Sequence, residues 1–203
     1  MINKYSVPGW INNSQCDLIT DLIFSLPDNA KILEIGTAFG RSSCSILDGM
    51  KSSQTLDICD LWDNSHWTDM ANDTSYAKST LFGDSDVVDT ALKNLVQHGI
   101  RKTWESHVSQ HQNTNLIRNV FQQTSMSLVD TDYDLVFLDG EHSYNNLSNE
   151  LRKFKNVPII CGDDFSYHIG DEVIKAVIDF GKEYQKILTV DLQALFYVLR
   201  NRK

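Results

Sequence analysis

The sequence predicts an α/β fold organised around a doubly wound, mostly parallel β-sheet. Short apolar runs alternate with amphipathic stretches along the chain, which is the pattern of β-α-β units. Residues 135–138 are wholly apolar, as expected for a central strand buried on both faces. Four residues separate the apolar runs 187–190 and 195–199. Because that gap is too short for a helical crossover, these two strands should pair antiparallel.

The same signals order the elements along the chain. We expect strands at residues 31–35, 55–59, 116–120, 135–138, 157–161, 187–190 and 195–199. The first helix should begin at Ser14, an N-cap residue with Asp17 three positions on, and should end near Pro27. Further helices are expected after Gly40 to about residue 48 and over residues 86–97, 103–110, 143–154 and 171–184. No repeat or low-complexity linker divides the chain, so we predict one domain spanning residues 1–203.

Composition limits the partners and the location. The net charge is -9, and the basic residues cluster only at Arg200, Arg202 and Lys203, so we expect no nucleic-acid partner. No apolar run approaches the ~20 residues that span a bilayer, and residues 1–10 lack the pattern of a secretion signal. We therefore expect no membrane partner and a cytoplasmic location. The four cysteines are widely spaced in apolar stretches, which favours buried reduced thiols over disulfides or a zinc site.

A glycine-containing turn follows the first predicted strand. Gly36 permits a backbone conformation that other residues avoid and lets a ligand approach closely. Gly40 stands at the entrance of the next helix, where free N–H groups favour polar or anionic groups. Glu34 lies just before the turn, within reach of the loop backbone or of a ligand amine. The spacing differs from the G-x-G-x-x-G fingerprint of nicotinamide sites, and an ordinary β-to-α turn is the alternative interpretation.

An acid at the end of the second strand strengthens the interpretation as a nucleoside site. Asp60 follows Gly40 by twenty residues. A carboxylate there can accept hydrogen bonds from both hydroxyls of a ribose, as in dinucleotide sites. The alternative is that Asp60 only caps the strand. Together with the glycine turn, it predicts ribose binding.

Two further strands end in acids. Asp139 follows the fourth strand, and Asp163 and Asp164 follow the fifth. Ligands of doubly wound sheets bind outside the carboxyl ends of the strands, so we expect these side chains to converge. Gathered carboxylates repel one another unless a cation or a shared proton relieves them, and oxygen ligands suit Mg2+ or another hard divalent cation. The alternative for each acid is a helix N-cap.

His142 lies three residues after Asp139, at the top of the following helix. A histidine there is positioned to take a proton from a hydroxyl group held on the metal. The alternative is a solvent-exposed histidine at a helix start.

At this point the motifs resemble a known family. Residues 34–42 look like the glycine motif of class I S-adenosylmethionine-dependent methyltransferases, which have a Rossmann-like sheet with strand order 3-2-1-4-5-7-6. Residues 138–144 and 162–165 are similar to the metal-dependent small-molecule O-methyltransferases that include macrolide sugar O-methyltransferases and cephalosporin-hydroxylase-like proteins. The resemblance covers about residues 31–180. Glu141 replaces the commoner aspartate, and residues 121–125 lack the acid often found near the adenine.

The resemblance implies an enzyme and assigns its site. It implies methylation of a hydroxyl on a small molecule or sugar, with S-adenosyl-L-methionine as methyl donor and Mg2+ or another divalent cation bound. Asp139, Asp163 and Asp164 would be the metal ligands, and His142, with Asp139, would be catalytic. The cofactor site would comprise Glu34, Gly36, Thr37, Ala38, Gly40, Ser42, Asp60, Leu61 and Asp139. A homo-oligomer is an open alternative to a single copy.

Other interpretations remain open from the residues alone. The insertion at residues 61–112 includes His66 and three aromatic residues, Trp62, Trp67 and Tyr76. It would form a lid over the site or a surface loop with its aromatic side chains in the core. A nicotinamide-dependent oxidoreductase also uses a glycine loop and an acid on the second strand. A non-catalytic nucleoside-binding module of the same fold is a third interpretation. A haloacid-type phosphatase is disfavoured, because it would need a nucleophilic aspartate at the end of the first strand, where this chain has Glu34 and Gly36.

Overall fold

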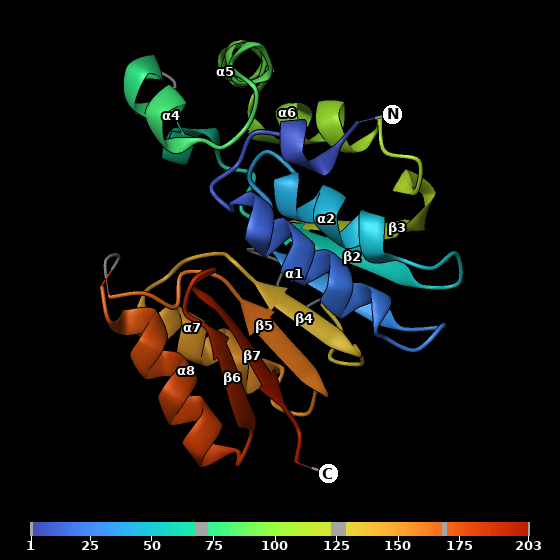
Figure 1. Ribbon diagram of the computed structural model, residues 1–203, viewed down its shortest axis with the longest axis vertical. Coiled ribbons are helices and arrows are strands. Elements are labelled where there is room, and N and C mark those ends of the chain that lie inside the picture. The colour runs from blue at the N-terminus through green and yellow to red at the C-terminus, as the bar shows by residue number, and fades with distance from the viewer. Residues whose placement is uncertain (1, 68–72, 123–128, 168–169, 203) are drawn as a thin grey trace. The chain divides into compact units, whose positions relative to one another are not determined.

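The computed structural model describes residues 2–67, 73–122, 129–167 and 170–202. Within these ranges the chain forms a seven-stranded sheet in the order β3-β2-β1-β4-β5-β7-β6 (Figure 1). The order reverses between β1 and β4, which is the switch point of a doubly wound sheet. β7 pairs antiparallel with both β5 and β6, whereas β1 pairs parallel with β2 and β4. The predicted sheet and its antiparallel C-terminal hairpin are therefore confirmed.

The strands lie within two residues of their predicted bounds. They are β1 (Lys31–Ile35), β2 (Thr55–Asp60), β3 (Ile117–Gln122), β4 (Leu135–Leu138), β5 (Ile159–Gly162), β6 (Ile187–Asp191) and β7 (Phe196–Arg200). All four residues of β4 are buried, as their apolar run predicted.

Most helices also follow the sequence pattern. They are α1 (Asn13–Phe24), α2 (Arg41–Gly49), α4 (Thr74–Thr80), α5 (Ser85–His98), α6 (Ile100–Val108), α7 (Tyr144–Lys153) and α8 (Glu172–Glu183), with 3-10 turns η1 (Lys4–Ser6), η2 (Asn64–Trp67) and η3 (Thr114–Leu116). The predicted start of the first helix at Ser14 is wrong. Asn12 is the N-cap, because its side chain and that of Gln15 form a reciprocal capping box.

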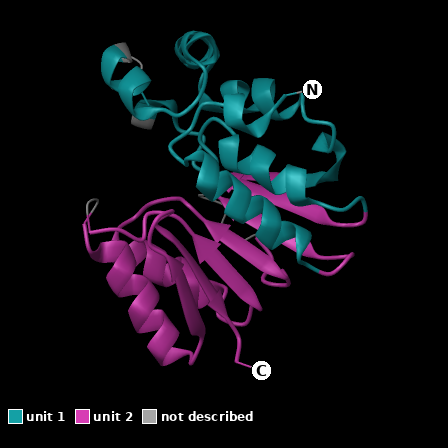
Figure 2. Cartoon of the chain, viewed as in Figure 1, with its two compact units in different colours: residues 1–26, 37–52, 60–118 teal, residues 27–36, 53–59, 119–203 magenta. Residues whose placement is uncertain are grey.

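The chain divides into two compact units (Figure 2). Unit 1 comprises residues 1–26, 37–52 and 60–118, and unit 2 comprises residues 27–36, 53–59 and 119–203. In unit 2, α7 and α8 pack their apolar faces against one face of the sheet. In unit 1, α5 and the start of α6 gather around the side chain of Phe39. That these two units together form the single domain predicted for residues 1–203 stays a prediction.

Two smaller expectations concern the cysteines and membrane insertion. All four cysteines belong to the described residues, and each is a buried free thiol, as predicted. Among the described residues, no helix combines the length and the apolar character needed to cross a bilayer.

Candidate active site

The sheet register brings the predicted site residues to the carboxyl ends of neighbouring strands. Ile35 pairs with Cys59 and with Leu138, and Leu138 pairs with Gly162. The next residues along these strands are Gly36, Asp60, Asp139 and Asp163. The sequence prediction that these acids and the glycine turn follow adjacent strand ends is therefore correct.

Gly36 meets both requirements that the sequence suggested for it. Its φ of +82° lies in the left-handed region that favours glycine, and a Cβ placed there would overlap the carbonyl oxygen of Asp139. Its N–H donates to the carbonyl of Cys59 at 2.9 Å. The N–H of Asp139 donates to Ile35 at 2.8 Å. The glycine turn thus leaves the sheet directly beside the backbone of Asp139.

Asp60 organises backbone in unit 1. Its Oδ2 accepts the N–H of Thr37 at 2.8 Å, and its Oδ1 accepts the N–H of Trp62 at 3.0 Å. Ala38 and Trp62 both have positive φ, 44° and 52°, which is costly for non-glycine residues and clusters at functional sites. Each oxygen of Asp60 retains a second lone pair. Holding the loop is therefore an observed role of Asp60, and ribose binding stays a prediction.

The remaining predicted cofactor residues differ in exposure. Thr37 is buried, and its Oγ1 has no hydrogen-bond partner among the described residues. Gly40 is the N-cap of α2 with φ +98°, and no side chain caps that helix end. Glu34 and Ser42 are buried, and Leu61 is half-buried. A buried hydroxyl without a partner beside an uncapped helix start fits a polar ligand.

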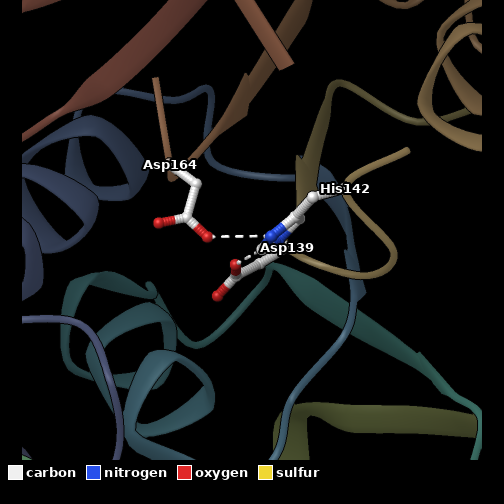
Figure 3. A group of neighbouring side chains, drawn as sticks. All are labelled: Asp139, His142 and Asp164. Atoms are coloured by element: carbon white, nitrogen blue, oxygen red, sulfur yellow. Dashed lines mark ion pairs between the residues drawn. The ribbon is translucent and has the colours of Figure 1, made fainter. Parts of the chain in front are cut away.

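Three of the predicted chemical residues converge in unit 2 (Figure 3). Asp139, His142 and Asp164 present ligand atoms that all lie within 4.8 Å of one another. His142 Nδ1 lies 3.0 Å from Asp164 Oδ2, and His142 Nε2 lies 3.7 Å from Asp139 Oδ1. Asp164 adopts a φ of 59°, so its backbone is strained where its side chain meets the histidine.

The charge of this cluster favours a protonated histidine. Asp139 and Asp164 raise the pKa of His142 from 6.5 to about 10, against the opposing effect of burial. The 3.7 Å separation from Asp139 is longer than a hydrogen bond. Accordingly, the buried Nε2 of His142 has no hydrogen-bond partner among the described residues. The cluster therefore holds two acceptor side chains and one nitrogen with unused bonding capacity.

Asp163 is not one of the residues that present ligand atoms within 4.8 Å of one another. Its side chain is buried, and its Oδ1 accepts the N–H of Asp164 at 2.7 Å. Metal ligation by Asp163 stays a prediction. The structure instead groups His142 with Asp139 and Asp164. The sequence pattern predicted only proton transfer for His142. The three-residue spacing from Asp139 to His142 was the signal that could have placed it among the ligands.

Two aromatic residues of the predicted lid, Trp62 and Trp67, pack against aromatic rings of unit 1. Trp62 lies 5.3 Å from Trp104, and Trp67 lies 5.4 Å from Trp10, between ring centroids. Tyr76 is exposed. Residues 68–72 of the insertion and residues 123–125 of the segment expected near the adenine lie outside the described residues. The lid stays a prediction.

Comparison with solved structures identifies the fold. The O-methyltransferase TomG from Streptomyces achromogenes, solved with S-adenosylmethionine, matches with a TM-score of 0.59 and 14% identity over 95% of this chain and 82% of that chain. An O-methyltransferase from Bacillus cereus, solved with S-adenosylhomocysteine, matches with a TM-score of 0.57 and 14% identity over 96% and 84%. A protein described as a putative rRNA-methylase from Clostridium thermocellum matches with a TM-score of 0.58 and 10% identity over 94% and 98%.

Sequence comparison identifies the family. No curated protein matches this chain in sequence. The profile of a family described as "Methyltransferase domain" matches residues 33–158, which is more than half of the chain and contains the glycine turn, Asp60 and Asp139. The predicted class of enzyme is thereby confirmed, and the chain belongs to this methyltransferase family.

Proposed function

We propose that the protein is an S-adenosylmethionine-dependent O-methyltransferase that acts on a hydroxyl of a small molecule, with a divalent cation assisting. One observation supports this most directly. Gly36 of the glycine turn contacts the backbone of Asp139, whose side chain faces His142. Gly36, the first residue of the turn, therefore contacts one member of a cluster suited to activating a hydroxyl group.

The residues of the glycine turn fit the methyl donor. Thr37 offers a buried hydroxyl that has no partner in the described part of the chain, and Asp60 offers second lone pairs for ribose hydroxyls. Two solved proteins of the same fold are described as complexes with the donor or its demethylated product. A nicotinamide-dependent oxidoreductase and a non-catalytic module are the alternatives. The family match favours the methyltransferase over the oxidoreductase.

The cluster of Asp139, His142 and Asp164 fits a divalent cation. Two carboxylates from different strand ends are the donors that hard cations prefer, and the positive charge that offsets them comes from protonated His142 in the metal-free protein and would come from a cation when one is bound. We assign Asp139 and Asp164 as the ligands, with Asp163 as a candidate from sequence. A cation held there would polarise the acceptor hydroxyl and, by offsetting the carboxylate charge, would lower the pKa of His142.

His142 is assigned as the general base. Because a carboxylate only accepts, Nδ1 carries the hydrogen that points to Asp164 Oδ2. The neutral ring would then take the hydroxyl proton at Nε2. S-adenosylmethionine, when bound, would supply the methyl group: a C–O bond to the acceptor oxygen would form as the C–S bond breaks, with its electron pair left on sulfur. The products are the methyl ether and S-adenosylhomocysteine.

The central experiment measures formation of S-adenosylhomocysteine with a panel of vicinal diols and sugars as acceptors. His142→Gln should slow turnover by about 10² to 10⁴, the usual contribution of a positioned base. Asp164→Asn should lose activity and Mn2+ binding together, the latter read by electron paramagnetic resonance. Glu141→Gln is the matched control, because Glu141 is an exposed acid next to His142 whose Oε1 accepts a hydrogen bond from the Ser143 hydroxyl at 2.7 Å.

Two results would contradict the proposal in different parts. Full activity of Asp164→Asn in the presence of EDTA would contradict the role of the cation and leave the assignment as a methyltransferase intact. If calorimetry showed that the protein binds NAD and does not bind S-adenosylhomocysteine, the assignment as a methyltransferase would itself be contradicted. The cytoplasmic location, the sugar acceptor, the absence of a nucleic-acid partner and any homo-oligomer remain predictions from the sequence.

A further inference from the structure

A buried histidine outside the acidic cluster contacts the glycine loop. His107 of α6 is 5% exposed, and its Nδ1 lies 2.8 Å from the carbonyl oxygen of Phe39. A carbonyl oxygen can only accept, so Nδ1 carries the hydrogen and donates it. Burial lowers the pKa of His107 below its ordinary 6.5, so the ring is neutral at pH 7. A neutral, oriented imidazole therefore fixes one carbonyl of the loop.

The same face of α6 contacts the residues that follow Phe39. Trp104 Nε1 donates to Ser43 Oγ at 3.0 Å, and both groups are buried. At Gly40, a Cβ would come within 2.9 Å of Val108 Cγ2 and 3.0 Å of Trp104 Cδ1. Trp104, His107 and Val108 are spaced as neighbours on one helical face. One face of α6 thus holds the exit of the glycine loop and the first turn of α2.

The other end of α6 is fixed to the segment that follows Asp60. Asn64 Oδ1 accepts the N–H of Ile100, which caps the start of the helix. The ring of Trp62 lies 5.3 Å from that of Trp104, and the N–H of Trp62 bonds to Asp60. Asp60 also holds Thr37 of the loop. The loop is therefore held from both sides, by Asp60 and by α6.

We propose that His107 is a positioning residue for the methyl donor, acting through the carbonyl of Phe39 to hold the glycine loop in its binding conformation. This inference rests on the proposed function. If the carbonyl lost its donor, a buried polar group would be left without a partner, and the loop would gain alternative conformations in which it binds the donor poorly.

The chain provides a matched control in a second buried histidine. His111 is 4% exposed, and its Nε2 lies 2.9 Å from Oδ1 of Asp48, near the end of α2. The N–H of Asn113 donates to its Nδ1. His107 and His111 thus both connect the α6 region to α2, one at the loop end and the other at the far end. Only the first should affect the donor.

The experiment compares binding of S-adenosylhomocysteine by calorimetry to the wild type, His107→Leu, His107→Asn and His111→Leu. We expect His107→Leu to weaken binding about tenfold, equal to about 1.4 kcal/mol. His107→Asn should bind within about threefold of the wild type, because its amide nitrogen occupies the place of Nδ1 and can donate to Phe39. His111→Leu should bind like the wild type while unfolding at a lower temperature. Hydrogen exchange at residues 37–43 should increase in His107→Leu alone.

Each outcome separates the inference from the proposed function. A wild type that binds no S-adenosylhomocysteine overturns the proposed function and this inference with it. A wild type that binds, with equal affinity in His107→Leu, overturns the inference alone. If His107→Leu does not fold, His107→Gln replaces it, because its amide reaches the place of Nε2 rather than Nδ1. Equal binding by His107→Asn and His107→Gln would then contradict the inference.

Discussion

The glycine loop and the acidic cluster use histidine in opposite ways. At the loop, His107 is buried beside a carbonyl, and burial lowers its pKa. At the cluster, His142 faces two carboxylates, and they raise its pKa to about 10. Helix α6 holds the loop through neutral hydrogen bonds and apolar packing. The cluster of Asp139, His142 and Asp164 is built from charge.

This difference indicates what each region needs in order to function. The loop must keep one backbone conformation, and neutral hydrogen bonds provide that at every pH where His107 stays uncharged. The cluster must accept and release charge, and unlike charges held within a few ångströms respond strongly to any added cation or proton. The predictions below test this division, beginning with the largest expected effect.

The largest effect is expected at Gly36, which contacts the backbone of Asp139 within unit 2. Gly36→Ala adds a Cβ that overlaps the carbonyl of Asp139 and also requires an unfavourable φ. We expect a loss of at least about 3 kcal/mol in the free energy of unfolding, because strain at φ and overpacking add. Urea denaturation measures it.

Gly170→Ala is the control for the conformational part of that loss. Gly170 has φ +109°, but no atom of the described residues lies within 4 Å of an added Cβ. The free energy of unfolding of Gly170→Ala should fall only by the cost of backbone strain, about 1 to 3 kcal/mol. Equal losses in the two variants would mean that the approach of Gly36 to Asp139 is not close.

The sequence could predict the strand ends but not which side chains meet there. Apolar runs predicted the mostly buried strands such as β1 and β4, because a buried strand needs consecutive apolar residues. The strands β3 and β6 carry polar residues and are only partly buried, so their signal in the sequence was weaker. The motif Gly-Asp-Asp, however, does not reveal which of two adjacent carboxylates turns toward His142. That depends on the left-handed backbone of Asp164, φ 59°, which forms only when the rest of the site holds it.

The support of the loop by α6 was also beyond the sequence. Trp104 and His107 read as part of an ordinary amphipathic helix, and their partners Ser43 and Phe39 lie more than sixty residues earlier. Local patterns encode the face of a helix that is buried but not the partner that it is buried against. Such contacts are decided by tertiary packing alone.

The second prediction concerns pH in the metal-free protein. His142 has a folded pKa above its unfolded value of 6.5, so its contribution to stability is fully present below pH 6.5 and is lost as the pH rises toward about 10. His107 has a folded pKa below 6.5, so the unfolded chain takes up its proton first and stability falls as the pH drops below 6.5. In a plot of stability against pH, His142 should therefore affect the alkaline limb and His107 the acid limb.

Urea denaturation in EDTA from pH 5 to pH 10 measures both limbs. His142→Gln should flatten the alkaline limb, and His107→Asn should flatten the acid limb. If both variants changed the same limb, the electrostatic contrast between the two regions would be wrong. Histidine resonances in nuclear magnetic resonance spectra, assigned with the same variants, give the two pKa values directly.

The smallest effect is expected at Thr37, whose buried hydroxyl has no partner among the described residues. Thr37→Val keeps the shape and removes the hydroxyl. Because an unsatisfied buried hydroxyl costs free energy, the ligand-free variant should be as stable as the wild type or more stable, by up to about 1 kcal/mol. Its affinity for S-adenosylhomocysteine should nevertheless fall about threefold to tenfold, the worth of one hydrogen bond.

Thr103→Val supplies the contrast for that prediction. Thr103 is fully buried in α6, but its hydroxyl donates to the carbonyl of Gly99 at 2.9 Å. Its loss should lower stability by about 1 kcal/mol and leave the affinity nearly unchanged. If Thr37→Val raises stability but lowers the affinity for S-adenosylhomocysteine, the Thr37 hydroxyl serves to bind the ligand. The rest of the loop is held by α6 and Asp60. A loss of stability in Thr37→Val would instead mean that its hydroxyl already has a partner in the ligand-free protein.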